Sequence, residues 1–160
     1  MKCFECGNEM VEKRETVRDH QLGLPNVVLL NVPVRHCKKC GEREVVFPQI
    51  ARLHRLLART LISKHTRLTA PEVRYLRKYL GWSSSDLAHR IGVAPETISR
   101  WENGHEAIGV VPDRLLRLIV ALEKPVEAYS TKVLDEISPE EPKPTPLNVS
   151  VKEEGYELVA

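Results

Sequence analysis

Several features are missing from this 160-residue chain, and each absence narrows the classes of protein to which it can belong. No stretch approaches the ~20 consecutive apolar residues that a membrane-spanning helix needs. The first residues, Met1 to Glu5, lack the apolar segment of a secretory signal. No cysteine occurs after residue 40. We therefore expect a cytoplasmic protein that does not associate with membranes.

The short motifs of common enzyme classes are missing as well. The sequence has no Gly-rich phosphate loop, no His-Glu-x-x-His pattern and no Gly-x-Ser-x-Gly turn. Only the cysteines suggest an enzyme, because Cys-x-x-Cys also occurs in thiol redox proteins. We expect that the protein is not an enzyme.

Charge is distributed unevenly along the chain, although the net charge is only +2. Residues 49–68 carry five Lys or Arg and no Asp or Glu. Residues 125–160 carry three basic and eight acidic side chains. A basic middle favours a polyanionic partner, and an acidic C-terminal part is repelled by one.

The four cysteines form two copies of one pattern, Cys3-Phe-Glu-Cys6-Gly7 and Cys37-Lys-Lys-Cys40-Gly41. Such a turn brings two thiolates to one side of a tight bend, and the glycine permits the positive φ that the bend often needs. Two turns that face each other supply four sulfurs at the corners of a tetrahedron. Zinc suits this donor set, and four protein ligands leave no position for a catalytic water.

A structural zinc ion is thus the first interpretation of the cysteines, and a thiol redox pair is the second. The redox motif normally stands in a β-α-β context that this sequence lacks. His36 is adjacent to a cysteine and His20 lies between the two pairs. We expect neither histidine to be a ligand, because four cysteines already satisfy the metal.

Helix start and stop signals alternate along residues 69–104. Capping boxes are expected to begin helices near Thr69 and Ser83, and Pro95 stands where a third helix should start. The expected ends are marked by glycine, at Gly81, Gly92 and Gly104. Two short helices joined by a glycine-containing turn are the pattern of a helix-turn-helix.

Apolar residues predict how this helical unit packs. Ile98 and Trp101 should anchor the third helix to the core. A fourth helix should close the bundle through Leu115, Leu118, Ile119 and Leu122. The remaining apolar residues are candidates for an exposed face that joins two copies, namely Val110, Val111, Leu116 and Val120.

The helix that begins at Pro95 should enter the major groove of DNA, with its first turns near the base edges. Its outward residues are expected to be Glu96, Thr97, Ser99 and Arg100. An arginine can bind guanine through two acceptors, and a glutamate can accept from a cytosine amino group. Ser84 and Asn103 lie at helix ends, where phosphates usually pass. Alternatively, Glu96 and Arg100 form an ordinary surface ion pair at i and i+4.

These signals predict an α+β protein in four segments. A small β-rich zinc-binding domain (1–48) is followed by a linking helix and hinge (49–68), an all-α helix-turn-helix domain (69–137) and an acidic, Pro-rich tail (138–160). The end of the tail has two possible fates. It forms a hairpin or pairs with a partner's sheet, or it remains disordered.

The order of the motifs resembles the zinc-finger/helix-turn-helix antitoxins of the MqsA type over about residues 1–124, and the second half is similar to Xre/Cro-like repressors. The resemblance is carried by the two Cys-x-x-Cys-Gly motifs, by Leu68 to Arg77 and by Ser99-Arg-Trp-Glu-Asn-Gly104. It implies that the zinc unit neutralises a ribonuclease toxin. It also implies that the helical unit forms a homodimer on a palindromic operator of double-stranded DNA and represses transcription, with Arg100 reading bases.

Two functions remain open at this point. One is the antitoxin of a type II toxin–antitoxin pair, and the other is a stand-alone Xre-type regulator without a toxin. The strand expected at Val27–Val34 favours the first, because its edge is available to a partner protein, although it is equally explained as core. The basic stripe of Arg52, Arg55 and Arg59 has no assigned role: it contacts phosphates, contacts a toxin or is simply solvated.

Overall fold

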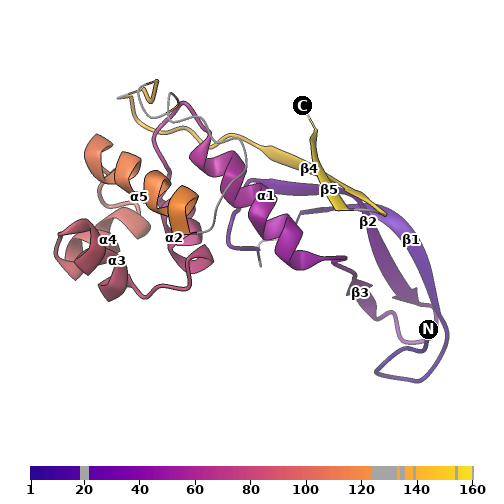
Figure 1. Ribbon diagram of the computed structural model, residues 1–160. Coiled ribbons are helices and arrows are strands. Elements are labelled where there is room, and N and C mark those ends of the chain that lie inside the picture. The colour runs from indigo at the N-terminus through magenta and orange to yellow at the C-terminus, as the bar shows by residue number, and fades with distance from the viewer. Residues whose placement is uncertain (19–21, 124–132, 134–135, 139, 154, 160) are drawn as a thin grey trace. The chain divides into compact units, whose positions relative to one another are not determined.

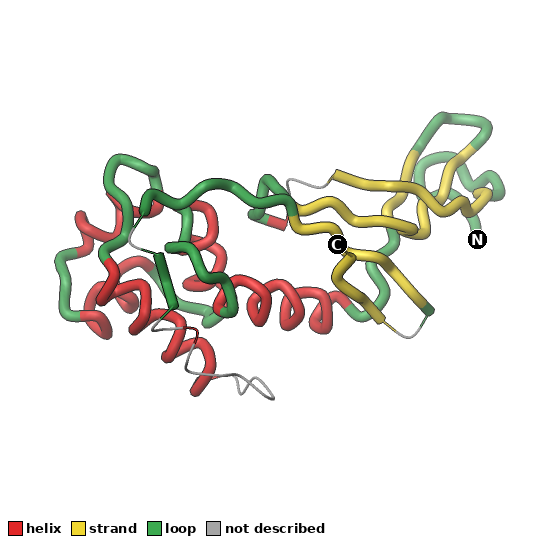
Figure 2. Tube along the Cα trace, turned by 90° about the horizontal axis from the view of Figure 1, so that it is seen from above, coloured by secondary structure: helices red, strands yellow, loops and turns green. Residues whose placement is uncertain are grey.

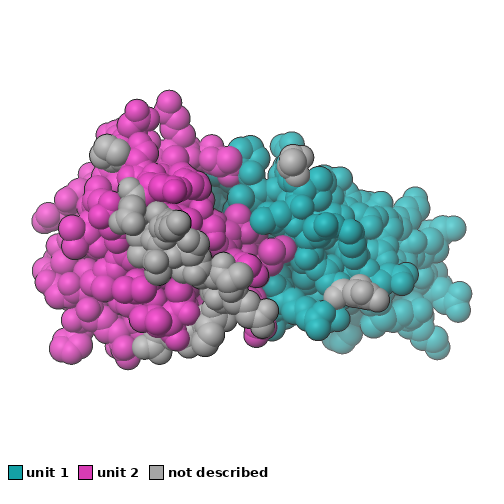
Figure 3. Space-filling view, turned by 45° about the horizontal axis from the view of Figure 1, so that its top comes forward, with its two compact units in different colours: residues 1–53, 146–160 teal, residues 54–145 magenta. Residues whose placement is uncertain are grey.

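The computed structural model describes residues 1–18, 22–123, 133, 136–138, 140–153 and 155–159. The chain divides into two compact units, and Figure 3 shows each in its own colour. Unit 1 combines residues 1–53 with 146–160, and unit 2 comprises residues 54–145. Unit 1 is a β-sheet with the cysteines and unit 2 is helical, so the predicted α+β class is confirmed. None of the described helices is long and apolar enough to cross a membrane.

Unit 1 is built on one mixed sheet (Figure 1). Its strands are β1 (Met10–Arg18), β2 (Val27–Cys37), β3 (Arg43–Val45), β4 (Leu147–Lys152) and β5 (Gly155–Val159). The order across the sheet is β1-β2-β4-β5, and β3 also pairs with β2. All neighbours are antiparallel except β2 and β4, which run parallel. The apolar side chains that face the core are fully buried, namely Leu29, Val32, Val34, Val149 and Val151.

The long strand β2 has pairing partners along both of its edges. β1 follows one edge over nearly its whole length, whereas the other edge pairs first with β4 and then with β3. Asn31 lies between these two partners with a positive φ of 59°, and its side-chain amide donates to the carbonyl of Val151 at 2.9 Å. The suggestion that Val27–Val34 offers a free edge to a partner is therefore wrong: the chain's own C-terminal strand occupies that position.

The C-terminal residues give the largest difference from the expected organisation. The segment from residue 138 was expected to be a separate tail, yet β4 and β5 form a hairpin that extends the N-terminal sheet (Figure 2). Of the fates weighed for the end of the tail, a hairpin is the one observed. Its alternating apolar residues, Val149 and Val151, are buried against the sheet, and this burial compensates for ordering a segment so distant in sequence.

Unit 2 is a bundle of short helices, and its boundaries follow the predicted signals. Helix α1 (Ile50–Ile62) leads into α2 (Ala70–Tyr79), α3 (Ser84–Ile91), α4 (Pro95–Glu102) and α5 (Val110–Glu123). The predicted capping boxes at Thr69 and Ser83 are both present. Gly92 ends α3 in the left-handed conformation, with a φ of 80°. Ile98 and Trp101 are buried, as predicted.

The buried face of α5 differs from the predicted one. Leu116 and Val120 were expected to be exposed, but they are fully buried, whereas Leu122, which was expected in the core, is 69% exposed. The reason is that α5 also buries two charged residues, Asp113 and Arg117. A prediction from apolar residues alone places charged residues in solvent. Because Asp113 and Arg117 were therefore assigned to the exposed face, Leu116 and Val120 beside them were predicted to be exposed as well.

The buried pair of Asp113 and Arg117 secures the hinge before α2. The Arg117 guanidinium lies 2.5 Å from the Asp113 carboxylate. It also donates to the three main-chain carbonyls of Ile62, Lys64 and Thr66. The other carboxylate oxygen accepts from the Leu68 N–H at 2.6 Å. One ion pair thus provides hydrogen-bond partners for three carbonyls and one N–H of the segment between α1 and α2.

Candidate metal centre and nucleic-acid interface

The cysteines lie on two turns that have the same backbone geometry. In the first turn the Gly7 N–H donates to the Cys3 carbonyl at 2.9 Å, and in the second the Gly41 N–H donates to the Cys37 carbonyl at 3.0 Å. Both glycines have positive φ, 69° and 76°. A side chain at either position would be strained, which is why glycine follows each cysteine pair. The predicted turn chemistry is confirmed.

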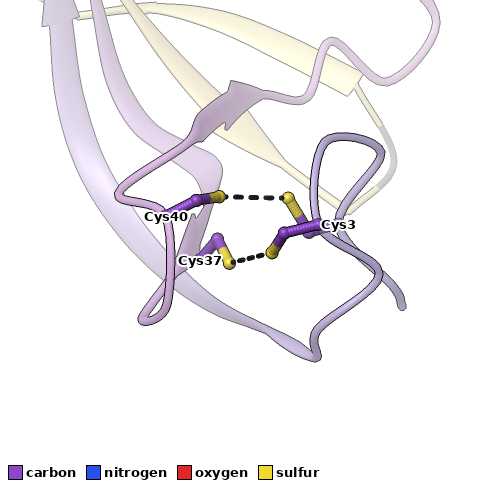
Figure 4. Close-up of side chains that lie close together, drawn as sticks. Cys3, Cys37 and Cys40 are labelled. Atoms are coloured by element: carbon purple, nitrogen blue, oxygen red, sulfur yellow. Dashed lines mark hydrogen bonds between the residues drawn. The ribbon is translucent and has the colours of Figure 1, made fainter.

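The four sulfurs gather in one cluster. Figure 4 shows Cys3 facing Cys37 and Cys40 across the gap between the two turns. The Sγ atoms of Cys3 and Cys40 are 3.6 Å apart, those of Cys6 and Cys37 are 3.4 Å apart, and all four lie within 4.8 Å of one another. A tetrahedron with metal–sulfur bonds of ~2.3 Å has edges of ~3.8 Å. Disulfides need ~2.05 Å, so these distances describe four free thiols with room for an ion.

The surroundings of Cys37 and Cys40 shift their thiol pKa values in opposite directions. The backbone N–H groups of Cys40 and Lys39 donate to the sulfur of Cys37 and lower the pKa of that thiol to about 6. The N–H of Glu42 lowers the pKa of Cys40 too, but the sulfurs of Cys37, Cys6 and Cys3 outweigh it and raise that pKa to about 12. Once one thiol has lost its proton, its negative charge disfavours the deprotonation of a second thiol. A divalent cation among the sulfurs would offset this repulsion between thiolates.

Among the described residues, the four cysteines alone make up the sulfur cluster. The Nε2 atom of His36 lies 2.7 Å from a Glu15 carboxylate oxygen, and this histidine is not part of the sulfur cluster. His20 lies outside the described residues.

Phe4, between the first two cysteines, is 100% exposed, and Met1 is 74% exposed. The N-terminal turn therefore presents apolar side chains to solvent beside the cysteine cluster.

In unit 2, α3 and α4 are joined by the turn from Gly92 to Ala94. Ala88 on α3 is 1% exposed, and its small side chain lets α4 approach closely. Ser83 and Asp86 cap α3 reciprocally, with the Ser83 N–H donating to the carboxylate at 2.8 Å. Hydrogen bonds from the Ser83 hydroxyl and N–H lower the pKa of Asp86. Pro95 starts α4, as the sequence predicts.

The residues predicted to contact DNA fall into two groups. Glu96 and Arg100 on α4 are exposed, and within the described part of the chain no ion pair joins them or engages Arg100. Ser99 and Asn103 are also exposed, but they bind each other, with 3.2 Å between the Asn103 amide and the Ser99 hydroxyl. The two remaining positions, Ser84 and Thr97, are half-buried.

A buried glutamate ties the end of α4 to α2. Glu102 is 7% exposed, and the Arg77 guanidinium donates to both of its carboxylate oxygens, at 2.6 and 2.8 Å. This pairing raises the pKa of Arg77. Arg74 donates to the Glu102 carbonyl and to Asn103. No motif in the sequence predicts this cluster. Its only signal is an acidic residue directly after the buried Trp101.

Comparison with known families agrees with this geometry. Residues 73–127 match the family model HTH_3, described as Helix-turn-helix. The chain therefore carries an Xre-like helix-turn-helix domain, the kind of domain through which transcriptional regulators bind DNA. Beyond that match, neither a curated protein nor a solved structure is found to be similar.

Proposed function

We propose that this protein is the antitoxin of a type II toxin–antitoxin pair, which neutralises a ribonuclease toxin through unit 1 and represses its own operon through unit 2. One observation carries the proposal: a cluster of four cysteine sulfurs and a helix-turn-helix occur in the same chain. The first gives a small sheet a rigid end for a protein contact, and the second supplies DNA binding. The protein has no enzymatic role in this proposal.

The metal is zinc in this proposal. Cys3, Cys6, Cys37 and Cys40 would hold it, because four thiolates at these distances match its tetrahedral preference. With all four positions taken by sulfur, the ion would act by fixing the two turns relative to each other. It would supply stability rather than a reactive site.

DNA binding is assigned to the exposed side of α4. Arg100 is exposed and free of ion pairs in the described part of the chain, so its guanidinium is available for a guanine. Thr97 and Glu96 lie nearer the start of the same helix. The Arg77–Glu102 pair would hold α4 in place while these side chains read the major groove.

A homodimer on DNA is supported by a stripe along α5. Val111, Leu115, Leu118 and Leu122 follow the spacing of a coiled-coil seam. The two ends of the stripe, Val111 and Leu122, are 75% and 69% exposed, and the two residues between them are half-buried. Pairing this stripe between two copies would bury apolar surface and place two α4 helices on one operator. This stripe keeps Val111 from the face that the sequence suggested and leaves out Leu116 and Val120, which are buried.

The toxin contact is assigned to the cysteine end of unit 1. Because β2 has no free edge, a partner has to use another surface. Phe4 and Met1 are exposed on the N-terminal segment, and the Met10 N–H donates to the Met1 carbonyl at 3.0 Å, which ties this segment to the start of β1. A fully exposed phenylalanine on a rigid turn is the kind of anchor that carries much of the energy of an interface.

Co-expression with the product of the adjacent gene tests the proposal, with a tag on that product. We expect a stable complex with the wild-type chain. Phe4→Ala should bind the product at least about tenfold more weakly while keeping its metal content, and Arg100→Ala should bind it normally. If the adjacent product never co-purifies, the toxin partner is refuted. Retained binding to the chain's own promoter DNA would then favour a stand-alone zinc-containing Xre-type regulator, the function that the helix-turn-helix match supports equally well.

A further inference from the structure

The two margins of the sheet in unit 1 differ in how open they are to a further strand. β1 forms one margin, and four consecutive charged residues, 12–15, lie along it. Its register with β2 also shifts between Glu15 and Val17. Charged side chains and irregular pairing are common means by which an edge strand is protected from adding another strand. The β1 margin is therefore a poor acceptor.

β5 forms the opposite margin and has neither of these protections (Figure 2). Glu157 is its only charged residue, and its pairing with β4 keeps one register from Gly155 to Val159. Within the described part of the chain, no strand pairs with the outer side of β5. In an antiparallel pair, every second residue of a strand turns its N–H and C=O away from the neighbouring strand. The outer side of β5 therefore offers backbone donors and acceptors to another strand.

The apolar core of unit 1 is left incomplete at this margin. Tyr156 and Leu158 lie opposite Val151 and Val149 in the β4–β5 register, so they continue the row of side chains that faces the core. The two valines are fully buried, whereas Leu158 is 41% exposed. Val159, on the other face of the strand, is 40% exposed. A strand added beside β5 would cover apolar surface on both faces.

The charge of this margin discriminates between possible added strands. The β4–β5 hairpin contains one lysine, Lys152, and three glutamates, at positions 153, 154 and 157. If two β5 strands from two copies paired symmetrically over their whole length, Glu157 would lie directly opposite the same glutamate of the second copy, which is destabilising. Lys152 pairs with Glu157, but both side chains are more than half exposed, so the carboxylate stays accessible to a second cation. The margin therefore favours a basic strand over a second copy.

We propose that the outer side of β5 binds an extended segment of another protein as an additional antiparallel strand. This segment would place apolar side chains opposite Tyr156 and Leu158 and a basic side chain opposite Glu157. Main-chain hydrogen bonds would supply affinity, and the alternation of apolar and basic residues would supply specificity. The site uses neither Phe4 nor α4, so it stands or falls separately from the toxin contact and from DNA binding.

NMR spectra of the isotope-labelled full chain test this site with a synthetic peptide. The probe is Thr-Val-Lys-Val-Thr with both termini blocked, which sets its lysine opposite Glu157 and a valine on either side. We expect saturable shifts of the β5 amides at roughly millimolar peptide, with slower hydrogen exchange at alternate amides of this strand. The same peptide with glutamate in place of lysine should bind roughly fivefold more weakly. Methylation of alternate backbone nitrogens of the peptide should abolish saturable binding, because it removes the donors.

Charge variants of the hairpin identify the strand that binds. Glu157→Lys should reverse the preference, so that the glutamate peptide binds roughly fivefold more tightly than the lysine peptide. Glu153→Lys makes the same change of charge in the turn of the hairpin and should keep the wild-type preference. The amide spectrum of each variant shows whether it is folded.

Four results would overturn the proposal. The β5 amides do not respond to the lysine peptide, the methylated peptide binds equally well, or a folded Glu157→Lys variant keeps the wild-type preference. In the fourth, the β5 amides shift with the concentration of the chain alone, which would assign this margin to a second copy.

Discussion

Replacing Asp113 with alanine should destabilise the helical unit strongly. Asp113 and Arg117 are both 0% exposed, so removing the carboxylate leaves a guanidinium charge inside the bundle. Breaking a buried pair in this way costs about 3–5 kcal/mol. The Leu68 N–H also loses its acceptor. Against a domain stability of about 5–15 kcal/mol, this is a large fraction.

Urea unfolding followed by circular dichroism measures the effect. With a slope of about 1–3 kcal/mol per molar urea, the transition midpoint should fall by roughly 1–5 M. Asp113→Leu combined with Arg117→Met should recover part of the loss, because no uncompensated charge remains. Glu106→Ala, an exposed carboxylate of the same unit, should change stability by less than about 0.5 kcal/mol. A shift in Asp113→Ala no larger than in Glu106→Ala would refute the reasoning.

Three further predictions concern the interface, the metal centre and pH. Arg100→Ala should weaken binding to promoter DNA by about 1–3 kcal/mol in fluorescence anisotropy. Arg100→Lys should keep the salt dependence of binding, because the charge remains, and should lose the discrimination between bases. Unchanged discrimination in Arg100→Lys would exclude a base contact by Arg100. Cys37→Ser should reduce metal content well below one ion per chain and lower the melting temperature of the sheet, and a full metal complement in this variant would exclude the four-sulfur site. Partial burial lowers the pKa of His54 below its usual value near 6.5, so the unfolded chain takes up this proton at a higher pH than the folded chain does. The contribution of His54 to stability should therefore be constant above about pH 6.5 and fall as the pH drops below it, and His54→Gln should reduce the slope of stability against pH below 6.5 in urea unfolding; an equal slope in the variant would rule out this histidine.

Local signals in the sequence predicted the clustering of the four cysteines and the starts of the capped helices. Each Cys-x-x-Cys-Gly turn is determined by five consecutive residues, and the helix caps by four. The spacing alone was therefore sufficient to place Cys3, Cys37 and Pro95 correctly. The prediction that the two cysteine turns face each other required one further assumption, namely that all four sulfurs bind the same ion.

Long-range contacts could not be predicted in this way. The pairing of Leu29 with Val149 joins strands more than a hundred residues apart, and nothing in either strand specifies the other. The buried face of α5 was mispredicted because Arg117 is stabilised by carbonyls of the hinge, which no periodicity reveals. The stripe of Arg52, Arg55 and Arg59 keeps its three alternative roles, which are contact with phosphates, contact with a toxin and simple solvation.

Native mass spectrometry of the chain mixed with the adjacent gene product and its promoter duplex tests the central claim most directly. The account predicts a species that contains the duplex, two copies of the chain with one zinc ion each, and the adjacent product. A spectrum in which the chain carries zinc and binds DNA, while the adjacent product is absent from every species, would contradict the antitoxin function.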